Sequence, residues 1–335
     1  MATSKPRVRV LGTGGTIAGI GPHRLDYFLY VEVGRFMPIE ESLSRIPEVN
    51  DIAEVQWENV TSVRSMSIGS SEWLQMAQRI NQIFEEDPDV AGVVVTHGTA
   101  TLEETAFFLH LTVKSPKPVV ITGAMRPASA MSTDADINLI DAIRIAASPA
   151  AVGKGVLTVL NNQIHSARDV TKSNTFRVET FRPNELGFLG YADSDGEVVF
   201  YRTPTRKHTT ATPFDVAGLD SLPRVDIVYS YAEADGLLID AVRRNRSDGL
   251  VLAGLGAGLA PPAVWEAGGR AVEDGIPVVL ASRATAGRVV MTPRIEELGF
   301  IVCDNLLPQK SRILLKLALT LTRDRKEIQG MFHEH

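Results

Sequence analysis

Short runs of β-branched and other apolar residues recur along the chain, and most of them end at a glycine. One run, Gly155–Leu160, ends instead at Asn161 and Asn162. Such compact apolar runs are typical of strands buried in a parallel sheet, and their alternation with helical stretches indicates the α/β class. The other predicted strands are Arg7–Leu11, Gly92–Thr96, Val119–Thr122, Val225–Tyr229, Gly249–Ala253 and Pro277–Ala281. The predicted helices include Glu41–Arg45, Ser71–Glu86, Thr101–Val113 and Ala135–Ala147.

A region rich in proline and threonine interrupts this pattern at residues 201–223. Apolar residues such as Phe214 and Val216 punctuate it, which favours an ordered linker over a disordered one. The strand and helix pattern then resumes, and 335 residues are enough for two domains. We therefore predict a large N-terminal α/β domain at 1–200, a linker, and a smaller C-terminal α/β domain at 224–335.

Composition and charge narrow the class of protein. The chain is 44% hydrophobic and 22% charged, as in ordinary globular proteins. Its net charge is −6 and it has no long basic run, so neither nucleic acid nor an anionic membrane is predicted as a partner. The single cysteine, Cys303, excludes an intrachain disulfide and favours a cytoplasmic location. A periplasmic location stays open if a signal peptide has been removed.

The first candidate functional motif is the string GTGGTIAG at residues 12–19, directly after the first predicted strand. Glycines let the backbone turn sharply and approach a ligand closely. A dinucleotide-binding loop would need its third glycine where Ile17 stands, so the spacing disfavours that function. Thr13 and Thr16 would lie at the carboxyl end of a parallel strand, where open α/β sheets place their sites. A tight turn without a ligand remains the alternative.

The second motif is the string VTHGTATLEET at residues 95–105, which also ends a strand and opens a predicted helix. Thr99 would lie near free backbone N–H groups, where a developing oxyanion is stabilised. The spacing from Thr101 to Glu104 is that of a capping box. The alternative is therefore that Thr99 or Thr101 only caps the helix.

The third motif, ARDVTKSNT at residues 167–175, contains Lys172. A lysine acts as a base only where it is partly buried and neutral, and otherwise it is a solvated surface charge. The chain has no paired His and Cys spacing for zinc and no Gly-x-Ser-x-Gly turn. The sequence therefore predicts no metal site.

Together these strings resemble the signatures of the bacterial-type (class II-like) L-asparaginase/glutaminase family. The resemblance implies a two-domain asparaginase-like α/β fold, with a large, mostly parallel N-terminal sheet flanked by helices and a smaller C-terminal α/β domain. It implies a hydrolase that acts on amide C–N bonds without a metal or an organic cofactor. The likeness covers nearly the whole chain and continues through residues 123–127, 130–132, 168–174, 202–208, 212–216 and 307–310.

The resemblance also implies a site with two threonines. Thr16 would be the nucleophile that attacks the amide carbon, and Tyr30 on the following loop matches the activating tyrosine better than Tyr27 does. Thr99 would be the second threonine, coupled to Lys172. A threonine hydroxyl is a poor nucleophile until a neighbour takes its proton, which explains these pairings. The family further implies a homotetramer in which a neighbouring subunit completes each site.

Several positions that correspond to the family's substrate pocket carry different residues here. Ala100 stands where the family has aspartate, Met66 where it has glutamine, and Ala257 where it has asparagine. These polar side chains surround the α-ammonium group of asparagine in the family. An unpaired ammonium in a closed site costs several kcal/mol. The implied substrate-binding positions are Ser65 (for the carboxylate), Met66, Gly98, Ala100 and Arg294, with Glu296 as the alternative to Arg294.

We therefore predict hydrolysis of a small carboxamide, lactam or cyclic imide that lacks an α-ammonium group. One alternative is an ordinary L-asparaginase or glutaminase whose ammonium site comes from other residues, for example Glu296 or Asp26. Another is a non-catalytic ligand-binding protein on the same scaffold. The retained Thr16, Thr99 and Lys172 disfavour that last alternative.

Overall fold

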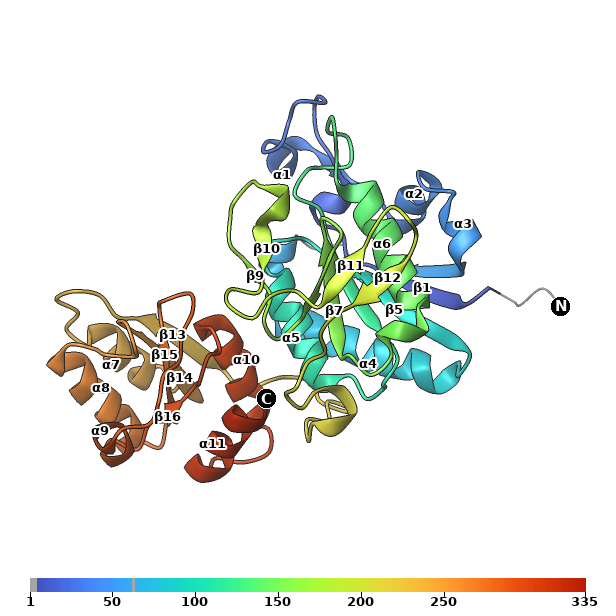
Figure 1. Ribbon diagram of the computed structural model, residues 1–335. Helices are drawn as coiled ribbons and strands as arrows, with labels where there is room; N and C mark the ends of the chain where they lie inside the picture. Colours follow the sequence, from blue (N-terminus) through green and yellow to red (C-terminus); the bar gives the residue numbers. More distant parts are fainter. Residues whose placement is uncertain (1–4, 62–63) are drawn as a thin grey trace. The chain divides into compact units, whose positions relative to one another are not determined.

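The computed structural model describes residues 5–61 and 64–335, which form two compact units, Met1–Gly218 and Leu219–His335. Both units are built from strands and helices, and the predicted two-domain α/β fold is confirmed (Figure 1). The segment predicted as a linker falls mainly in the first unit. Phe214 and Val216 are buried there, and Lys114 Nζ donates hydrogen bonds of 2.9 Å to both oxygens of Thr212.

The described part of the first unit contains an eight-stranded mixed sheet of order β12-β11-β8-β7-β6-β5-β1-β4. The five strands from β4 to β7 in this order are parallel, whereas β8, β11 and β12 pair antiparallel with their neighbours. Their bounds are β1 Arg7–Gly12, β4 Glu54–Asn59, β5 Val90–Thr96, β6 Val119–Thr122, β7 Val156–Leu160, β8 Gln163–Ser166, β11 Gly190–Ala192 and β12 Val198–Phe200. Two small antiparallel pairs are β2 Gly19–Ile20 with β3 Arg35–Phe36, and β9 Thr171–Lys172 with β10 Phe181–Arg182.

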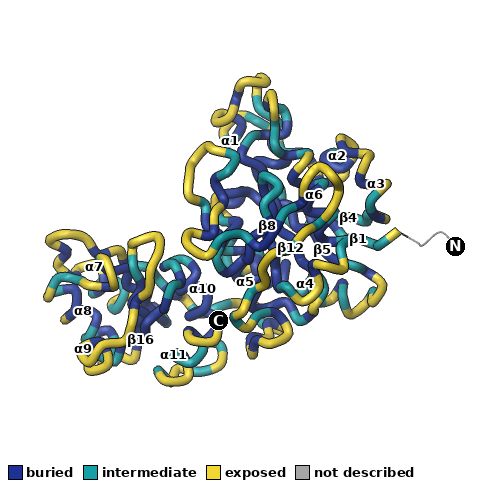
Figure 2. Tube along the Cα trace, in the orientation of Figure 1, coloured by how far each residue is buried: buried dark blue, intermediate teal, exposed yellow. Residues whose placement is uncertain are grey.

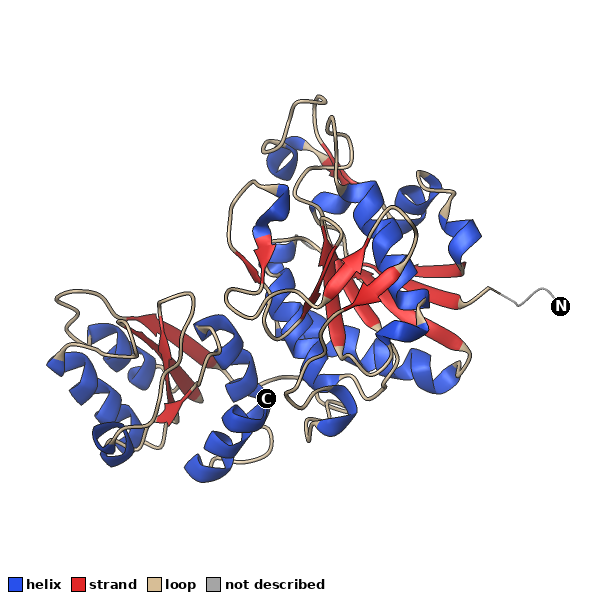
Figure 3. Ribbon diagram, viewed as in Figure 1, coloured by secondary structure: helices blue, strands red, loops and turns tan. Residues whose placement is uncertain are grey.

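Helices cover both faces of this sheet (Figure 3). The core on one face includes residues of α2, α3 and α6, and α5 packs against β7 on the other face together with α4. Nearly every residue of α5 is buried, and Phe108 stacks on Trp73 of α4 with ring centroids 5.5 Å apart. The helix bounds are α1 Tyr30–Val33, α2 Ile39–Ser44, α3 Val49–Ile52, α4 Ser70–Glu86, α5 Leu102–Thr112 and α6 Ala135–Ala147.

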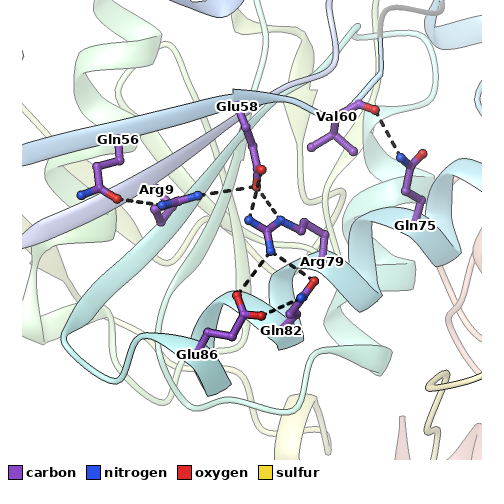
Figure 4. A network of polar contacts seen from close by, with 8 residues as sticks. All are labelled: Arg9, Gln56, Glu58, Val60, Gln75, Arg79, Gln82 and Glu86. Atoms are coloured by element: carbon purple, nitrogen blue, oxygen red, sulfur yellow. Dashed lines mark hydrogen bonds and ion pairs between the residues drawn. The ribbon is translucent and has the colours of Figure 1, made fainter.

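A network of charged and amide side chains joins β4, at the end of the sheet, to α4 (Figure 4). Arg79 Nε lies 2.8 Å from the Glu58 carboxylate, which lies 3.8 Å from the Arg9 guanidinium on β1. Arg79 also lies 3.7 Å from Glu86, and Arg9 donates a 2.7 Å hydrogen bond to Gln56. These contacts fix the strand from which the chain runs toward Ser65.

The second unit contains a parallel sheet of order β13-β14-β15-β16. Its inner strands β14 and β15 are almost entirely buried, as are β5, β6 and β7 of the first unit (Figure 2). The strand bounds are β13 Val225–Tyr229, β14 Gly249–Gly254, β15 Val278–Ser282 and β16 Ile301–Val302. The helix bounds are α7 Leu237–Arg244, α8 Pro262–Glu273, α9 Pro293–Glu297, α10 Pro308–Ala318 and α11 Arg325–Glu334. Among the residues described, no helix is both long enough and apolar enough to cross a membrane.

Candidate active site

The first two sequence motifs meet at the point where the strand order reverses. Strand β1 lies between β4 and β5, so the chain leaves β1 toward one side of the sheet and later returns to its other side. Open α/β sheets place ligand sites at such a reversal, outside the carboxyl ends of the strands. The string at 12–19 follows β1 and the string at 95–105 overlaps the end of β5, so both lie at this position.

Two glycines allow these motifs to touch. Gly15 has a φ of 89°, and a Cβ atom there would lie 2.3 Å from the Cα and N atoms of Gly98. A Cβ at Gly98 would in turn lie 2.5 Å from Ser65 Oγ. No larger residue fits either position without moving the backbone or the serine. The glycines therefore bring Thr16 and Thr99 to one cavity of about 150 Å³.

The cavity contains two hydrogen-bonded pairs. Thr16 Oγ1 and Tyr30 Oη lie 2.6 Å apart, and both residues are buried. Lys172 Nζ donates a 2.7 Å hydrogen bond to Thr99 Oγ1. Each threonine hydroxyl thus has its own neighbour for proton transfer. The residues that line the cavity are Gly15, Thr16, Tyr30, Val31, Phe36, Arg64, Ser65, Met66, Thr99, Ala100 and Lys172.

Asp26 positions Tyr30 from the start of its helix. Its carboxylate accepts hydrogen bonds from the backbone N–H groups of Phe28, Leu29 and Tyr30 at 2.7–3.1 Å. Burial opposes the charge of Asp26, but these backbone donors hold its pKa below the usual range. Tyr27, the other candidate tyrosine, is exposed, and its hydroxyl donates to a backbone carbonyl of another loop at 3.3 Å.

Burial shifts the pKa values of the two groups that are hydrogen-bonded to the threonines. It raises the pKa of Tyr30; the Asp26 charge adds to this, while the hydrogen bond with Thr16 opposes it. Tyr30 is therefore a neutral phenol near neutral pH. Burial lowers the pKa of Lys172, and the nearby Glu103 carboxylate opposes that shift. The amine of Lys172 is consequently easier to deprotonate than that of a solvated lysine.

Glu103 also holds the backbone that carries the lysine. Its carboxylate accepts a 3.1 Å hydrogen bond from the backbone N–H of Lys172. Because Glu103 lies in the first turn of α5, this bond ties the second motif to the third. Apart from its place in the motif, nothing in the sequence distinguishes Glu103 as a contact of Lys172.

Thr101 stands at the N-cap position of α5, but the predicted capping box is wrong. Its side chain makes no cap hydrogen bond and instead donates a 2.7 Å bond to the backbone oxygen of Ser65. This bond fixes the short helix that carries Ser65 and Met66 beside the second motif. Ser65 is buried, whereas the Met66 side chain is 62% exposed and Ala100 is exposed at the cavity.

His97, in the same motif, has a structural environment. Its Nδ1 lies 2.8 Å from the backbone oxygen of Gly98, and its Nε2 lies 3.0 Å from Thr105 Oγ1. Burial lowers its pKa to about 4, so the ring is neutral at physiological pH. His97 lines no part of the cavity and serves to hold the loop that carries Thr99.

Three of the positions that correspond to the family's substrate pocket lie in the second unit. Arg294 belongs to α9, and its guanidinium lies 5.1 Å from the ring centre of Trp265. Glu296, from the same helix, pairs with Arg325. Ala257 is exposed in the turn after β14.

Sequence analysis missed three residues that line the cavity, Val31, Phe36 and Arg64. Phe36 comes from β3, which pairs with β2 directly after the first motif. Arg64 directly precedes Ser65, and that adjacency was the available signal. Among the described residues, no three His, Cys, Asp or Glu side chains are grouped so that they could hold a metal ion.

Comparisons with known proteins identify the family of the chain. A family model described as "Asparaginase, N-terminal" matches residues 7–206, and one described as "Glutaminase/Asparaginase C-terminal domain" matches residues 224–332. The chain is 44% identical to "L-asparaginase 2" of Bacillus subtilis (strain 168) over 98% of its own length and 87% of that protein. The chain belongs to the bacterial-type asparaginase family.

Other members of the asparaginase family match over the whole chain. "L-asparaginase 2" of Escherichia coli (strain K12) is 41% identical, with 100% of this chain and 94% of that protein covered. "Glutaminase-asparaginase" of Pseudomonas fluorescens biotype A is 37% identical, with 99% and 91% covered. A solved structure described as "Probable Cytoplasmic L-asparaginase from Campylobacter jejuni" has a TM-score of 0.94 and 41% identity, with 99% of this chain and 100% of that one covered. The protein is therefore an amidohydrolase.

Proposed function

We propose that the protein releases ammonia from the side-chain amide of L-asparagine or L-glutamine, with Thr16 as the nucleophile. The names of the relatives favour these substrates over the predicted class without an ammonium group. The observation that carries the proposed chemistry is the presence of two pairs, Thr16 with Tyr30 and Thr99 with Lys172, in one cavity.

In the first half of the reaction, Thr16 Oγ1 attacks the amide carbon. Its proton passes to Tyr30. Because Tyr30 is a neutral phenol, it can accept this proton only while its own hydroxyl proton moves on toward the departing nitrogen. The C–N bond then breaks, ammonia leaves with a proton, and the acyl group remains on Thr16 as an ester. This step converts one difficult hydrolysis into two easier ones.

In the second half, a water molecule attacks the ester carbon. Neutral Lys172 takes a proton through Thr99, which its amine contacts at 2.7 Å. The ester bond to Thr16 breaks, the threonine oxygen takes back the proton that Lys172 received, and the acid product loses its remaining proton to solvent and leaves as a carboxylate. The lowered pKa of Lys172 supports this role, because a larger fraction of the amine is neutral near pH 7.

The test compares two variants that differ by one hydroxyl group. Thr16→Val keeps the shape of the side chain but has no nucleophile, and Thr16→Ser keeps the hydroxyl. Ammonia release from L-asparagine and L-glutamine should be lost in Thr16→Val and partly kept in Thr16→Ser, with both proteins folded by circular dichroism. Equal activity of Thr16→Val and the wild type would disprove the proposed nucleophile.

A specific observation favours a second candidate, a carboxamide, lactam or imide without an α-ammonium group. The described residues that line the cavity include no aspartate or glutamate, and Ala100 and Met66 are exposed there. Asp26 is already engaged by three backbone N–H groups. Parallel assays with L-asparagine and with succinamate, which has the same chain without the ammonium group, separate the two candidates by their kcat/KM.

The homotetramer and the cytoplasmic location are also proposals. The family resemblance supports a tetramer whose neighbouring subunits complete each site. The relatives are described both as cytoplasmic and as periplasmic. Light scattering of the purified protein tests the tetramer, and fractionation of cells that express the gene tests the location.

A further inference from the structure

A second cavity of about 180 Å³ adjoins the active-site cavity. The two share Gly15, Phe36 and Arg64 as lining residues, so they are neighbours along one wall. Each is smaller than the roughly 300–1,000 Å³ typical of small-molecule pockets, and together they reach the lower end of that range. The remaining residues that line the second cavity are Gly14, Met37, Pro38, Asn59 and Thr61.

Arg64 stands at the junction of these cavities. It occupies the N-cap position of the short 3-10 helix Ser65–Ser67, and its side chain is exposed. Within residues 5–61 and 64–335, no hydrogen bond or ion pair of its guanidinium is found, whereas Arg35 and Arg45 are paired with Glu41 and Asp136. Arg64 is therefore a cation available to a ligand.

The chemistry of the second cavity suits a short carbon chain that ends in a carboxylate. Phe36, Met37 and Pro38 offer an apolar wall. Asn59 is already engaged in two hydrogen bonds. Its Oδ1 accepts from the Ile39 N–H at 3.1 Å, and its Nδ2 donates to the Glu40 carboxylate at 3.0 Å. No described lining residue of either cavity is acidic, and a guanidinium matches the geometry of a carboxylate.

We propose that Arg64 and the second cavity form a subsite for a carboxylate-terminated acyl chain, and that Arg64 selects amide substrates that carry this carboxylate. The inference deepens the proposed function and rests on it, because it places the amide of the same substrate at Thr16. Arg64 is a specificity-determining residue in this arrangement, and Thr16 retains the chemistry.

Binding is measured first, because it does not depend on turnover. The probes are adipate and hexanoate, which have the same chain length and differ by one carboxylate, titrated calorimetrically into the Thr16→Val protein. Adipate should bind at least tenfold more tightly than hexanoate, and Arg64→Gln should remove that difference, as expected for one lost charge-assisted hydrogen bond of about 1.5 kcal/mol or more. Arg182→Gln is the matched control, because Arg182 is exposed, lines neither cavity and changes the net charge equally.

Blocking the cavity gives an independent readout. Thr61 lines only the second cavity, so Thr61→Phe should weaken adipate binding while Thr61→Ser should not. Equal binding of adipate and hexanoate, unchanged adipate binding in Arg64→Gln, or no measurable binding of adipate up to its solubility would overturn the subsite.

Ammonia release then separates this inference from the proposed function. With adipamate and the neutral hexanamide as substrates, Arg64→Gln should lower kcat/KM about tenfold or more for adipamate only. L-asparagine and L-glutamine are assayed beside these two amides. If adipate binding depends on Arg64 but none of the four amides releases ammonia, the proposed function is wrong and the subsite stands. If ammonia release depends on Thr16 but Arg64→Gln affects both amides equally, the function stands and the subsite is wrong.

Discussion

Restoring a carboxylate at position 100 tests the electrostatics of the second pair. Ala100 is exposed at the cavity and directly follows Thr99, whose hydroxyl receives the 2.7 Å hydrogen bond from Lys172. The Ala100→Asp variant places a negative charge near the amine. A nearby anion stabilises the protonated amine and raises its pKa. The proposed mechanism requires the neutral amine, so the acid limb of the pH–rate profile should move to higher pH.

The size of this shift follows from Coulomb's law. Two unit charges roughly 6 Å apart interact by about 2.8 kcal/mol at an effective dielectric constant of about 20. Position 100 is exposed to solvent, so we halve this value to about 1.4 kcal/mol, which corresponds to about one pH unit. The same carboxylate supplies a partner for an α-ammonium group, so KM for L-asparagine should fall about tenfold or more.

The assay records kcat/KM for ammonia release from pH 5 to pH 10 at constant ionic strength. Ala100→Asn is the control, because it has nearly the shape of aspartate without the charge. The wild type and Ala100→Asn should share one acid limb, and Ala100→Asp should lie to higher pH. An acid limb that moves to lower pH, or stays in place, would refute the role assigned to neutral Lys172.

Three further predictions follow from the site. Glu103→Gln removes the carboxylate that raises the pKa of Lys172, so the acid limb should move to lower pH; a shift to higher pH would contradict the assignment. Tyr30→Phe should lower kcat for ammonia release about 10²- to 10⁴-fold with little change in KM. If the Tyr30→Phe protein retains full activity, Tyr30 is not the proton-transfer partner of Thr16. Gly98→Ala puts a methyl group 2.5 Å from Ser65 Oγ, which should cost about 1–3 kcal/mol of stability. Calorimetry should therefore find a melting temperature lower by several degrees. An unchanged melting temperature together with full activity would show that the loops tolerate a side chain there.

The sequence predicted four of the five parallel strands of the first sheet, because β1, β5, β6 and β7 are compact apolar runs. It missed β4, whose sequence EVQWEN alternates polar and apolar residues at the end of the sheet. The antiparallel part of the sheet was also missed. After β7 the chain turns through Asn161 and Asn162, both with positive φ (53° and 62°), which is the conformation of a tight β-hairpin turn. The sequence showed that this strand ends at two asparagines, a known hairpin signal, but the strand that follows is short and holds His165 and Ser166.

The site was predictable in its motifs and less so in its contacts. Glycines in both motifs indicated a close approach of backbone, but not that Gly15 and Gly98 approach each other. The capping box failed because Thr101 reaches a carbonyl of a segment 36 residues away, and no local pattern reports such a partner. Arg64 was missed for a similar reason: its adjacency to Ser65 was visible in the sequence, but not its place between two cavities.

The charged network on β4 has a consequence for how the protein behaves at high concentration. Strand β4 ends the sheet, and an open strand edge is a template on which another chain can aggregate. An incoming strand would have to lie beside the paired charges of Arg9, Glu58 and Arg79 and remove some of their water. The contacts that pair these charges across β1, β4 and α4 therefore also discourage the protein from growing, strand by strand, into fibrils.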